Sequence, residues 1–199
     1  MTTFLFDFYG VLLRHRTLAE QNQLVHAVGA EDPDEFWRVV TELRPAYDAG
    51  LVSDESYWAQ VRSRLGLPEF DVQDVVDADF RYCTGADEEM RDFALGLVDA
   101  GHTVGALSNI PLGLAAMVRR DNPWLDSFAA LTLSCDIGLA KPDPRAYAVA
   151  VDALGARPED TFFIDDTAAN VEAARALGLQ AHYFDGIAGL RAAVGGLAG

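Results

Sequence analysis

The sequence predicts an α/β fold, in which helices cover both faces of a parallel sheet and a small helical bundle is inserted near its start. Short, continuously apolar runs that end in Gly, Asn or Asp recur along the chain, as is typical of strands buried on both faces. Amphipathic stretches separate the later runs, which is the alternation of a doubly wound sheet. One long interval, residues 17–84, carries helical periodicity alone and predicts the bundle.

Five apolar runs are the predicted strands of this Rossmann-like core: FLFDFYG (4–10), TVGALSN (103–109), LTLSCD (131–136), TFFIDD (161–166) and LQAHYF (179–184). The core helices are expected at 87–100, 112–120, 143–155 and 168–178, with a last helix and a frayed tail at 187–199. Asp143 can cap the third of these helices, Pro144 suits its first position, and Gly155 can end it. Gly178 can end the next helix in the same way.

The inserted bundle is expected to contain four helices, at 17–29, 33–48, 54–65 and 72–83. We therefore predict two domains, a core made of residues 1–16 and 85–199 and a helical cap made of residues 17–84. Arg44, Tyr47 and Trp58 lie in this cap, but the pattern does not show which side of the bundle each one faces.

Composition limits the classes of partner. The 199 residues have a formal net charge of -16, with acidic residues spread along the chain. Nucleic acid is therefore an unsuitable partner, because its binding depends on a basic patch that neutralises phosphates. An anionic substrate would need a local cationic site or a metal ion.

The cysteines and the apolar runs bear on the compartment. Cys83 and Cys135 are far apart and form no CxxC pair, which disfavours a disulfide framework and a thiolate metal site. No run reaches the ~18 to 20 apolar residues that cross a membrane, and the N-terminal run lacks a basic region before it. We expect a cytoplasmic protein without a membrane partner.

Polar residues stand where the predicted strands end, and the carboxyl ends of parallel strands meet at one edge of the sheet, where ligands bind. These residues are Asp7, Ser108, Asn109, Asp165 and Asp166, with Lys141 on the loop after the third strand. Each one alone could be a helix cap, a turn former or a surface charge. Together they predict one site.

The composition of this predicted site favours a metal ion and a phosphoryl group. Neighbouring carboxylates repel one another unless a cation lies between them, and hard oxygen ligands suit Mg²⁺. A lysine ammonium with hydroxyl and amide donors suits a phosphoryl group.

Four motifs, DFYGV, LSN, KPDPRAY and IDDTAANVEAARALG, occur in an order and spacing that resemble the haloacid dehalogenase superfamily over essentially the whole chain. The resemblance implies a hydrolase in which Asp7 is the nucleophile and forms an aspartyl ester or an aspartyl phosphate. It also implies that Ser108 and Asn109 hold the transferred group, while Lys141 neutralises charge on the nucleophile and the substrate.

The resemblance also implies a metal site. Phosphatase members hold Mg²⁺ with the nucleophile, with the backbone carbonyl two residues later and with an acid of the last motif. Here these ligands would be Asp7, the Tyr9 carbonyl, and Asp166 or Asp165.

Further substrate-binding candidates are three residues that lie between the nucleophile and the cap. Gly10 belongs to the first motif, and Arg14 and His15 follow the first strand where the chain leaves for the cap. His15 or an arginine could assist the leaving group or bind the rest of the substrate. A solvated basic turn is the alternative.

Tyr9 departs from the phosphatase pattern, which usually has an aspartate there as general acid and base. A tyrosine hydroxyl can donate a proton but, with an ordinary pKa near ~10, is a poor base. An aromatic residue at this position resembles the 2-haloacid dehalogenase branch, which works without metal. The acid pair Asp165 and Asp166 instead favours a phosphate substrate, and together with the cap stretch at residues 47–61 it resembles cap-bearing sugar-phosphate phosphatases.

The sequence therefore predicts a Mg²⁺-dependent phosphohydrolase of a small phosphomonoester, with sugar phosphates among the candidates and an aspartyl-phosphate intermediate on Asp7. Tyr9 keeps two alternatives open. One is a metal-independent 2-haloacid dehalogenase, and the other is a catalytically weak member of the fold that acts by binding. The sequence names neither the substrate nor the oligomeric state.

Overall fold

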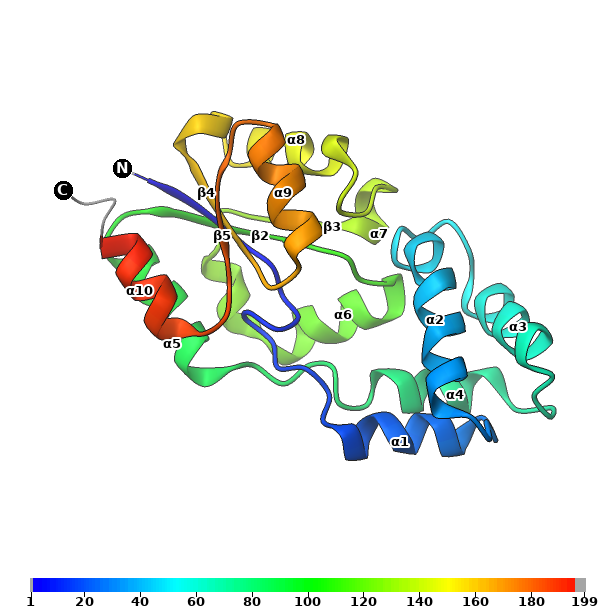
Figure 1. Ribbon diagram of the computed structural model, residues 1–199. Coiled ribbons are helices and arrows are strands. Elements are labelled where there is room, and N and C mark those ends of the chain that lie inside the picture. The colour runs from blue at the N-terminus through cyan, green and yellow to red at the C-terminus, as the bar shows by residue number, and fades with distance from the viewer. Residues whose placement is uncertain (1, 196–199) are drawn as a thin grey trace.

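The computed structural model describes residues 2–195 (Figure 1). Its sheet is parallel throughout, with the strand order β3-β2-β1-β4-β5. The strands are β1 (Thr3–Phe6), β2 (Thr103–Ser108), β3 (Ala130–Leu133), β4 (Thr161–Asp165) and β5 (Gln180–Tyr183). The predicted α/β, Rossmann-like core is confirmed.

Helices cover both faces of the sheet, because alternate residues of each buried strand point to opposite faces. Phe4 and Phe6 pack toward α5, α6 and α10, whereas Leu5 packs toward α8 and α9, so that the sheet has two separate apolar layers. Figure 1 shows these helices on either side of the strands. Their bounds are α5 (Glu88–Asp99), α6 (Leu112–Asp121), α8 (Pro144–Ala153), α9 (Ala168–Ala176) and α10 (Ile187–Gly195).

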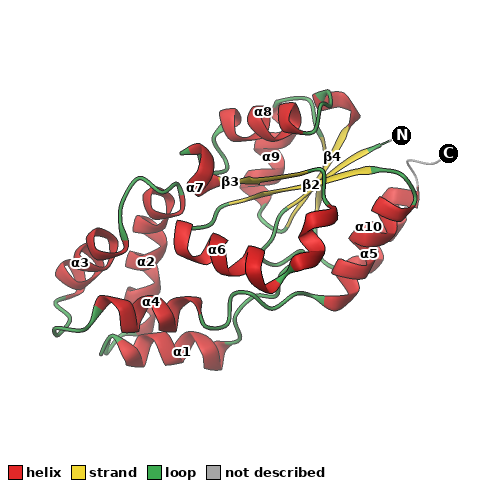
Figure 2. Ribbon diagram, turned by 180° about the vertical axis from the view of Figure 1, so that it is seen from behind, coloured by secondary structure: helices red, strands yellow, loops and turns green. Residues whose placement is uncertain are grey.

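The predicted inserted helices form a cap to one side of the sheet, as both ribbon views show (Figure 2). They are α1 (Leu18–Ala27), α2 (Pro33–Asp48), α3 (Asp54–Leu65) and α4 (Val72–Phe80). Trp58 and Tyr57 are fully buried among them, and Tyr47 stacks on Tyr57, so these aromatics form the core of the cap. The domain limits at residues 16/17 and 84/85 stay our proposal.

The end of α2 also touches the sheet core. The Ser134 hydroxyl, at the start of the short helix α7 (Ser134–Ile137), donates a hydrogen bond to the carbonyl oxygen of Asp48. The Ser134 Oγ in turn accepts a hydrogen bond from the backbone N–H of Ile110 at 2.8 Å. This contact positions the cap against the loop that follows β2.

Two boundaries differ from the sequence-based expectation. The strand expected at 131–136 stops at Leu133, because Ser134–Ile137 turn into α7, which Gly138 ends with a positive φ of 69°. The last helix ends at Gly195, and the predicted tail at 196–199 lies outside the described residues. The capping predictions for Asp143, Pro144 and Gly155 are confirmed. Within residues 2–195, every helix is too short or too polar to cross a bilayer.

Candidate active site

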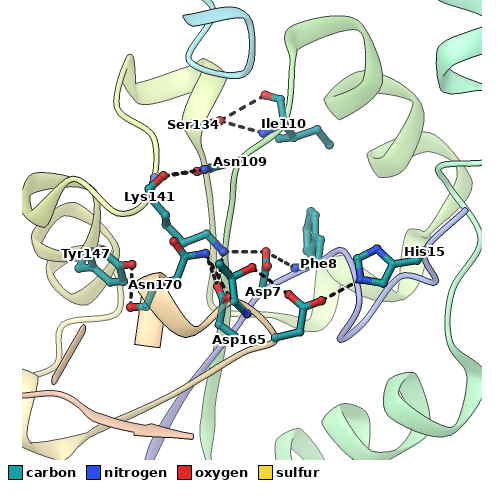
Figure 3. Close-up of polar contacts among 12 residues, drawn as sticks. Asp7, Phe8, His15, Asn109, Ile110, Ser134, Lys141, Tyr147, Asp165 and Asn170 are labelled. Carbon is teal, nitrogen blue, oxygen red and sulfur yellow. Dashed lines mark hydrogen bonds and ion pairs between the residues drawn. The ribbon is translucent and has the colours of Figure 1, made fainter. Parts of the chain in front are cut away.

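Asp7 follows β1 directly and lies at the centre of the polar cluster drawn in Figure 3. It is 7% exposed, and its Oδ1 accepts a hydrogen bond from the Phe8 N–H at 2.7 Å. The Lys141 Nζ lies 2.8 Å from the same oxygen. Oδ2 accepts no hydrogen bond from the described residues, so one carboxylate oxygen is held and the other is free to react. Burial raises the pKa of Asp7 to about 7, although the Lys141 ammonium opposes that rise.

Lys141 enters the cluster from the loop between α7 and α8, and it is buried. Its Nζ lies 2.6 Å from Asp165 Oδ2, so the ammonium bridges two carboxylates. Asn109 holds the backbone of this residue: Asn109 Nδ2 donates to the Lys141 carbonyl at 2.8 Å, and the Lys141 N–H donates to Asn109 Oδ1 at 2.7 Å. The side-chain amide of Asn109 therefore orients the lysine loop.

Asp165 and Asp166 are adjacent in sequence but have different environments. Asp165 is fully buried, and its two oxygens accept hydrogen bonds from Lys141, the Thr167 N–H and the Asn170 amide. Asp166 is partly exposed, and its Oδ2 lies 2.7 Å from His15 Nε2. The Asp165 carboxylate is thus satisfied by protein donors, whereas the Asp166 carboxylate contacts an exposed histidine.

The donor set fits a hard divalent cation. One carboxylate oxygen each of Asp7, Asp165 and Asp166 lie within 4.8 Å of one another. The Tyr9 carbonyl oxygen accepts no hydrogen bond from residues 2–195. In the turn that follows, the backbone N–H groups donate to the carbonyl oxygens of Phe8 and Leu13 instead. Oxygen-only donors at this spacing suit Mg²⁺.

Two buried hydroxyls near the cluster have no hydrogen-bond partner among the described residues, those of Ser108 and Tyr9. Ser108 ends β2 and is fully buried. Burial raises the pKa of the Tyr9 phenol well above its ordinary value, so this hydroxyl can donate a hydrogen bond but cannot serve as a base. Buried polar groups are usually paired, and an unpaired one at a site suggests an absent ligand atom.

Two adjoining hollows open around these residues. The first, which we call the Asp7 cavity, has a volume of about 210 Å³ and is lined by Asp7, Tyr9, His15, Asn109, Lys141, Asp166, Thr167 and Asn170. The second, the cap–core pocket, has a volume of about 170 Å³ and is lined by Tyr9, Arg14, His15, Arg16, Arg44, Asp48, Cys83, Asn109 and Leu114. Tyr9, His15 and Asn109 line both hollows, so the two lie side by side.

Gly10 allows the close approach of two of these side chains. Its φ is 79°, a left-handed conformation that favours glycine, and a Cβ added there would lie 2.1 Å from Asp166 Oδ2 and 2.4 Å from His15 Nε2. Gly10 therefore makes room for the Asp166–His15 pair. Gly10 lines neither hollow, so its predicted role in binding the substrate stays a prediction.

The structure brings most of the predicted site residues together, and it separates Arg14 from the Asp7 cavity. Arg14 lines only the cap–core pocket and forms a two-bond pair with Glu20, while His15 reaches both hollows. The sequence reasoning missed Asn170, which stands in the quoted IDDTAAN motif five residues after Asp165. Its position in the first turn of α9 is the signal that could have identified it.

The cap side of the site contains charged residues that the sequence did not link. Asp79, on α4, is fully buried between two arginines: Arg16 Nη1 lies 2.9 Å from its Oδ1, and Arg44 Nη1 lies 3.0 Å from its Oδ2. The Nε of Arg44 also donates to Asp48 Oδ1 at 2.8 Å. Arg44 and Asp48 are an i,i+4 pair on α2, but no local pattern in the sequence connects Arg16 or Arg44 with Asp79, because these pairs join separate segments.

Comparison with protein families and curated proteins gives consistent matches. A family profile described as haloacid dehalogenase-like hydrolase matches residues 1–178. A sesquiterpene phosphatase of Aspergillus oryzae is 28% identical over 184 residues, which span 89% of this chain and 88% of that protein. A phosphatase of Mycobacterium tuberculosis is 40% identical over 86 residues, or 43% of this chain and 40% of the relative.

Solved structures share the fold. A HAD family enzyme of Bacteroides thetaiotaomicron, in complex with magnesium and inorganic phosphate, superposes with a TM-score of 0.74 at 20% identity, covering 92% of this chain and 93% of that one. The L-2-haloacid dehalogenase of Xanthobacter autotrophicus, with chloropropionic acid covalently bound, has a TM-score of 0.64 at 19% identity, covering 91% of this chain and 76% of the other. At these identities the likeness concerns the fold alone.

Proposed function

The chain belongs to the haloacid dehalogenase-like hydrolase family, and from that premise we propose that it is a Mg²⁺-dependent phosphatase of small phosphomonoesters with Asp7 as its nucleophile. One observation carries the proposal: the free oxygen of a buried aspartate shares a cavity with a lysine ammonium and a second, accessible carboxylate. The phosphatase names of two curated relatives support the same reaction.

The metal would be held by Asp7, by the Tyr9 carbonyl and by Asp166. Asp165 is the less suitable ligand, because its oxygens already accept hydrogen bonds from Lys141, Thr167 and Asn170. When bound, Mg²⁺ offsets the negative charge of the phosphate and of the carboxylates around it. The Bacteroides thetaiotaomicron enzyme of the same fold binds magnesium and inorganic phosphate, which supports the choice of metal and of transferred group.

In the proposed reaction, Asp7 Oδ2 attacks the phosphorus and the bond between the phosphorus and the leaving oxygen breaks. The leaving oxygen keeps the electron pair of that bond and takes up a proton from solvent, so that it departs as an alcohol. Lys141 holds Oδ1, so the attacking oxygen is oriented before the substrate arrives. The unpaired Ser108 hydroxyl is available to donate a hydrogen bond to the transferred group. Water then cleaves the aspartyl phosphate, which releases phosphate and restores the Asp7 carboxylate.

The first test compares phosphate and halide release. We expect the purified protein to release phosphate from a panel of small phosphomonoesters with Mg²⁺ and to lose this activity in excess chelator, because the metal neutralises the acidic cavity. Phosphate is measured by a colorimetric assay, and chloride release from L-2-chloropropionate is measured in parallel. Chloride release that chelator leaves intact, without phosphate release, would instead establish the dehalogenase that Tyr9 favours.

A second test asks whether Asp166 is a metal ligand, by means of a substitution at the neighbouring Gly10. In Gly10→Ala the new methyl group displaces the Asp166 carboxylate, so we expect Mg²⁺ to bind at least about tenfold more weakly, as for loss of a supporting group at a metal site. Isothermal titration calorimetry with Mg²⁺ alone measures this affinity. The matched control is Gly138→Ala, since Gly138 has a φ of 69° and no atom would lie within 4 Å of its Cβ.

Both glycine variants should lose similar stability, about 1 to 2 kcal/mol, from the left-handed backbone. Only Gly10→Ala should lose metal affinity. Equal Mg²⁺ affinities in the two variants would remove Asp166 from the proposed ligand set.

A further inference from the structure

The cap–core pocket is the part of the site that the proposed phosphatase chemistry does not use. It adjoins the Asp7 cavity, with which it shares Tyr9, His15 and Asn109, and residues of the cap line its other side. A phosphoryl group next to Asp7 would therefore carry its leaving group toward this pocket. The chemistry of the pocket lining then determines which leaving group fits.

The arginines of the pocket are already paired. Arg44 bonds to Asp48 and Asp79, and Arg16 forms an ion pair with Asp79. The two guanidinium charges are thus matched by two carboxylate charges, and this cluster has no net charge.

The positive charge of Arg14, which also lines the pocket, is compensated by a carboxylate in the same way. Its Nη1 and Nη2 each donate to a carboxylate oxygen of Glu20 at 3.0 Å. The pocket therefore offers no cation whose charge is uncompensated among the described residues.

We propose that the cap–core pocket binds the leaving group of the substrate and selects a neutral, hydroxyl-bearing one, such as a hexose, through Arg44, Asp48 and the Tyr9 hydroxyl. The proposal rests on the phosphatase function given above and names the substrate class for that site. Hydroxyl groups both donate and accept hydrogen bonds, so they can bond to guanidinium and carboxylate groups without separating an ion pair.

A second anionic group fits this lining poorly. To bind Arg44 it would have to displace Asp48 or Asp79, and a buried carboxylate without its cation is strongly destabilising. Asp48 is itself 8% exposed, so its charge would repel a second phosphate at short range.

An apolar leaving group fits poorly as well. Most of the lining side chains are charged or polar, and an alkyl chain would cover them without replacing the hydrogen bonds that they make to water. The volume of about 170 Å³ is also below the roughly 300 to 1,000 Å³ of pockets that enclose drug-sized ligands, which indicates a small leaving group.

Tyr9 supplies an independent observation. Its hydroxyl is buried and has no hydrogen-bond partner among the described residues, and Tyr9 lines this pocket together with Arg44 and Asp48. A leaving-group hydroxyl would supply the missing partner. The residue that departs from the usual phosphatase pattern is therefore assigned to substrate selection.

The test measures kcat/KM for four esters: a hexose monophosphate, a hexose bisphosphate, an isoprenoid monophosphate and phenyl phosphate. We expect the hexose monophosphate to exceed the other three by about tenfold or more, since each unmatched polar group costs roughly one factor of ten. A preference for the bisphosphate or for the isoprenoid ester would overturn the proposed selectivity while leaving the phosphatase function intact.

Two variants probe the residues. Tyr9→Phe removes the hydroxyl but keeps the carbonyl, so the ratio of kcat/KM for hexose monophosphate to that for phenyl phosphate should fall about threefold to tenfold. Asp48→Asn leaves the arginines with one excess positive charge, so the bisphosphate-to-monophosphate ratio should rise about tenfold.

The matched controls lie in the cap outside the pocket. In Tyr82→Phe the lost hydroxyl bonds only to Gln23, and in Asp77→Asn the changed side chain is exposed and bonds to Gln73. Both should keep the wild-type ratios. Ratios that change equally in the controls and in the pocket variants would contradict the assignment.

A binding measurement separates the two proposals. Calorimetry on Asp7→Asn, which should not turn over, compares hexose monophosphate with inorganic phosphate. Tighter binding of the ester than of inorganic phosphate supports the proposed pocket, whether or not the wild-type protein hydrolyses the ester. Absence of hydrolysis by the wild-type protein would contradict only the phosphatase function. Equal binding of the two contradicts the pocket.

Discussion

Asp7→Asn is expected to reduce phosphate release by on the order of 10⁴-fold or more, the scale seen when a covalent nucleophile is removed. The amide has nearly the same shape as the carboxylate, so the hydrogen bond from the Phe8 N–H can remain. It cannot attack phosphorus, however, and although it does not carry the charge that pairs with Lys141, the lysine ammonium keeps Asp165 as its counter-charge. The loss is therefore chemical and should leave the fold in place.

Two measurements check this prediction. Steady-state phosphate release gives the fold-change, and mass spectrometry of acid-quenched protein shows whether a phosphoryl group is attached to the peptide that contains Asp7. We expect the modified peptide in the wild-type protein and not in Asp7→Asn. Asp99→Asn, an exposed change at the end of α5, is the control and should retain full activity. Activity of Asp7→Asn within tenfold of wild type would show that another group is the nucleophile.

Asp79→Asn is expected to lower the free energy of unfolding by about 3 to 5 kcal/mol, the cost of breaking a buried ion pair by removing one partner. Asp79 is fully buried, and it is the carboxylate that both Arg16 and Arg44 contact. An amide of the same size leaves Arg16 without a buried counter-charge. The effect concerns packing of the cap, since Asp79 does not line either hollow.

Urea denaturation followed by tryptophan fluorescence measures this loss, because Trp37 stacks with Arg16 and Trp58 lies in the cap core. The matched control is Asp77→Asn, on the same helix but exposed, which should stay within about 0.5 kcal/mol of wild type. If both variants lost the same free energy of unfolding, the ion pairs of Asp79 with Arg16 and Arg44 would stabilise the protein no more than an exposed charge does.

Much of the core could be predicted because its signals are local. A strand such as β1 is apolar on both faces, and a helix such as α8 has a capping aspartate, a first-turn proline and a closing glycine in a short window. The prediction of a strand at 131–136 was wrong at its carboxyl end, because the local pattern does not show where the backbone turns. Ser134 and Cys135 continue an apolar run, but their backbone turns into α7, and Ser134 uses its hydroxyl to bond to the cap.

The sequence by itself determined the fold class, the order of its elements and the set of polar residues at the strand ends, because periodicity and chain order carry that information. Only the tertiary structure distinguished the surroundings of Asp165 from those of Asp166. Their side chains lie in different surroundings, one toward Lys141 and the other toward His15, and adjacent positions in a sequence do not reveal this. The pairing of Arg16 and Arg44 with Asp79 was also decided there, because charges on separate segments meet only when those segments pack together in the folded chain.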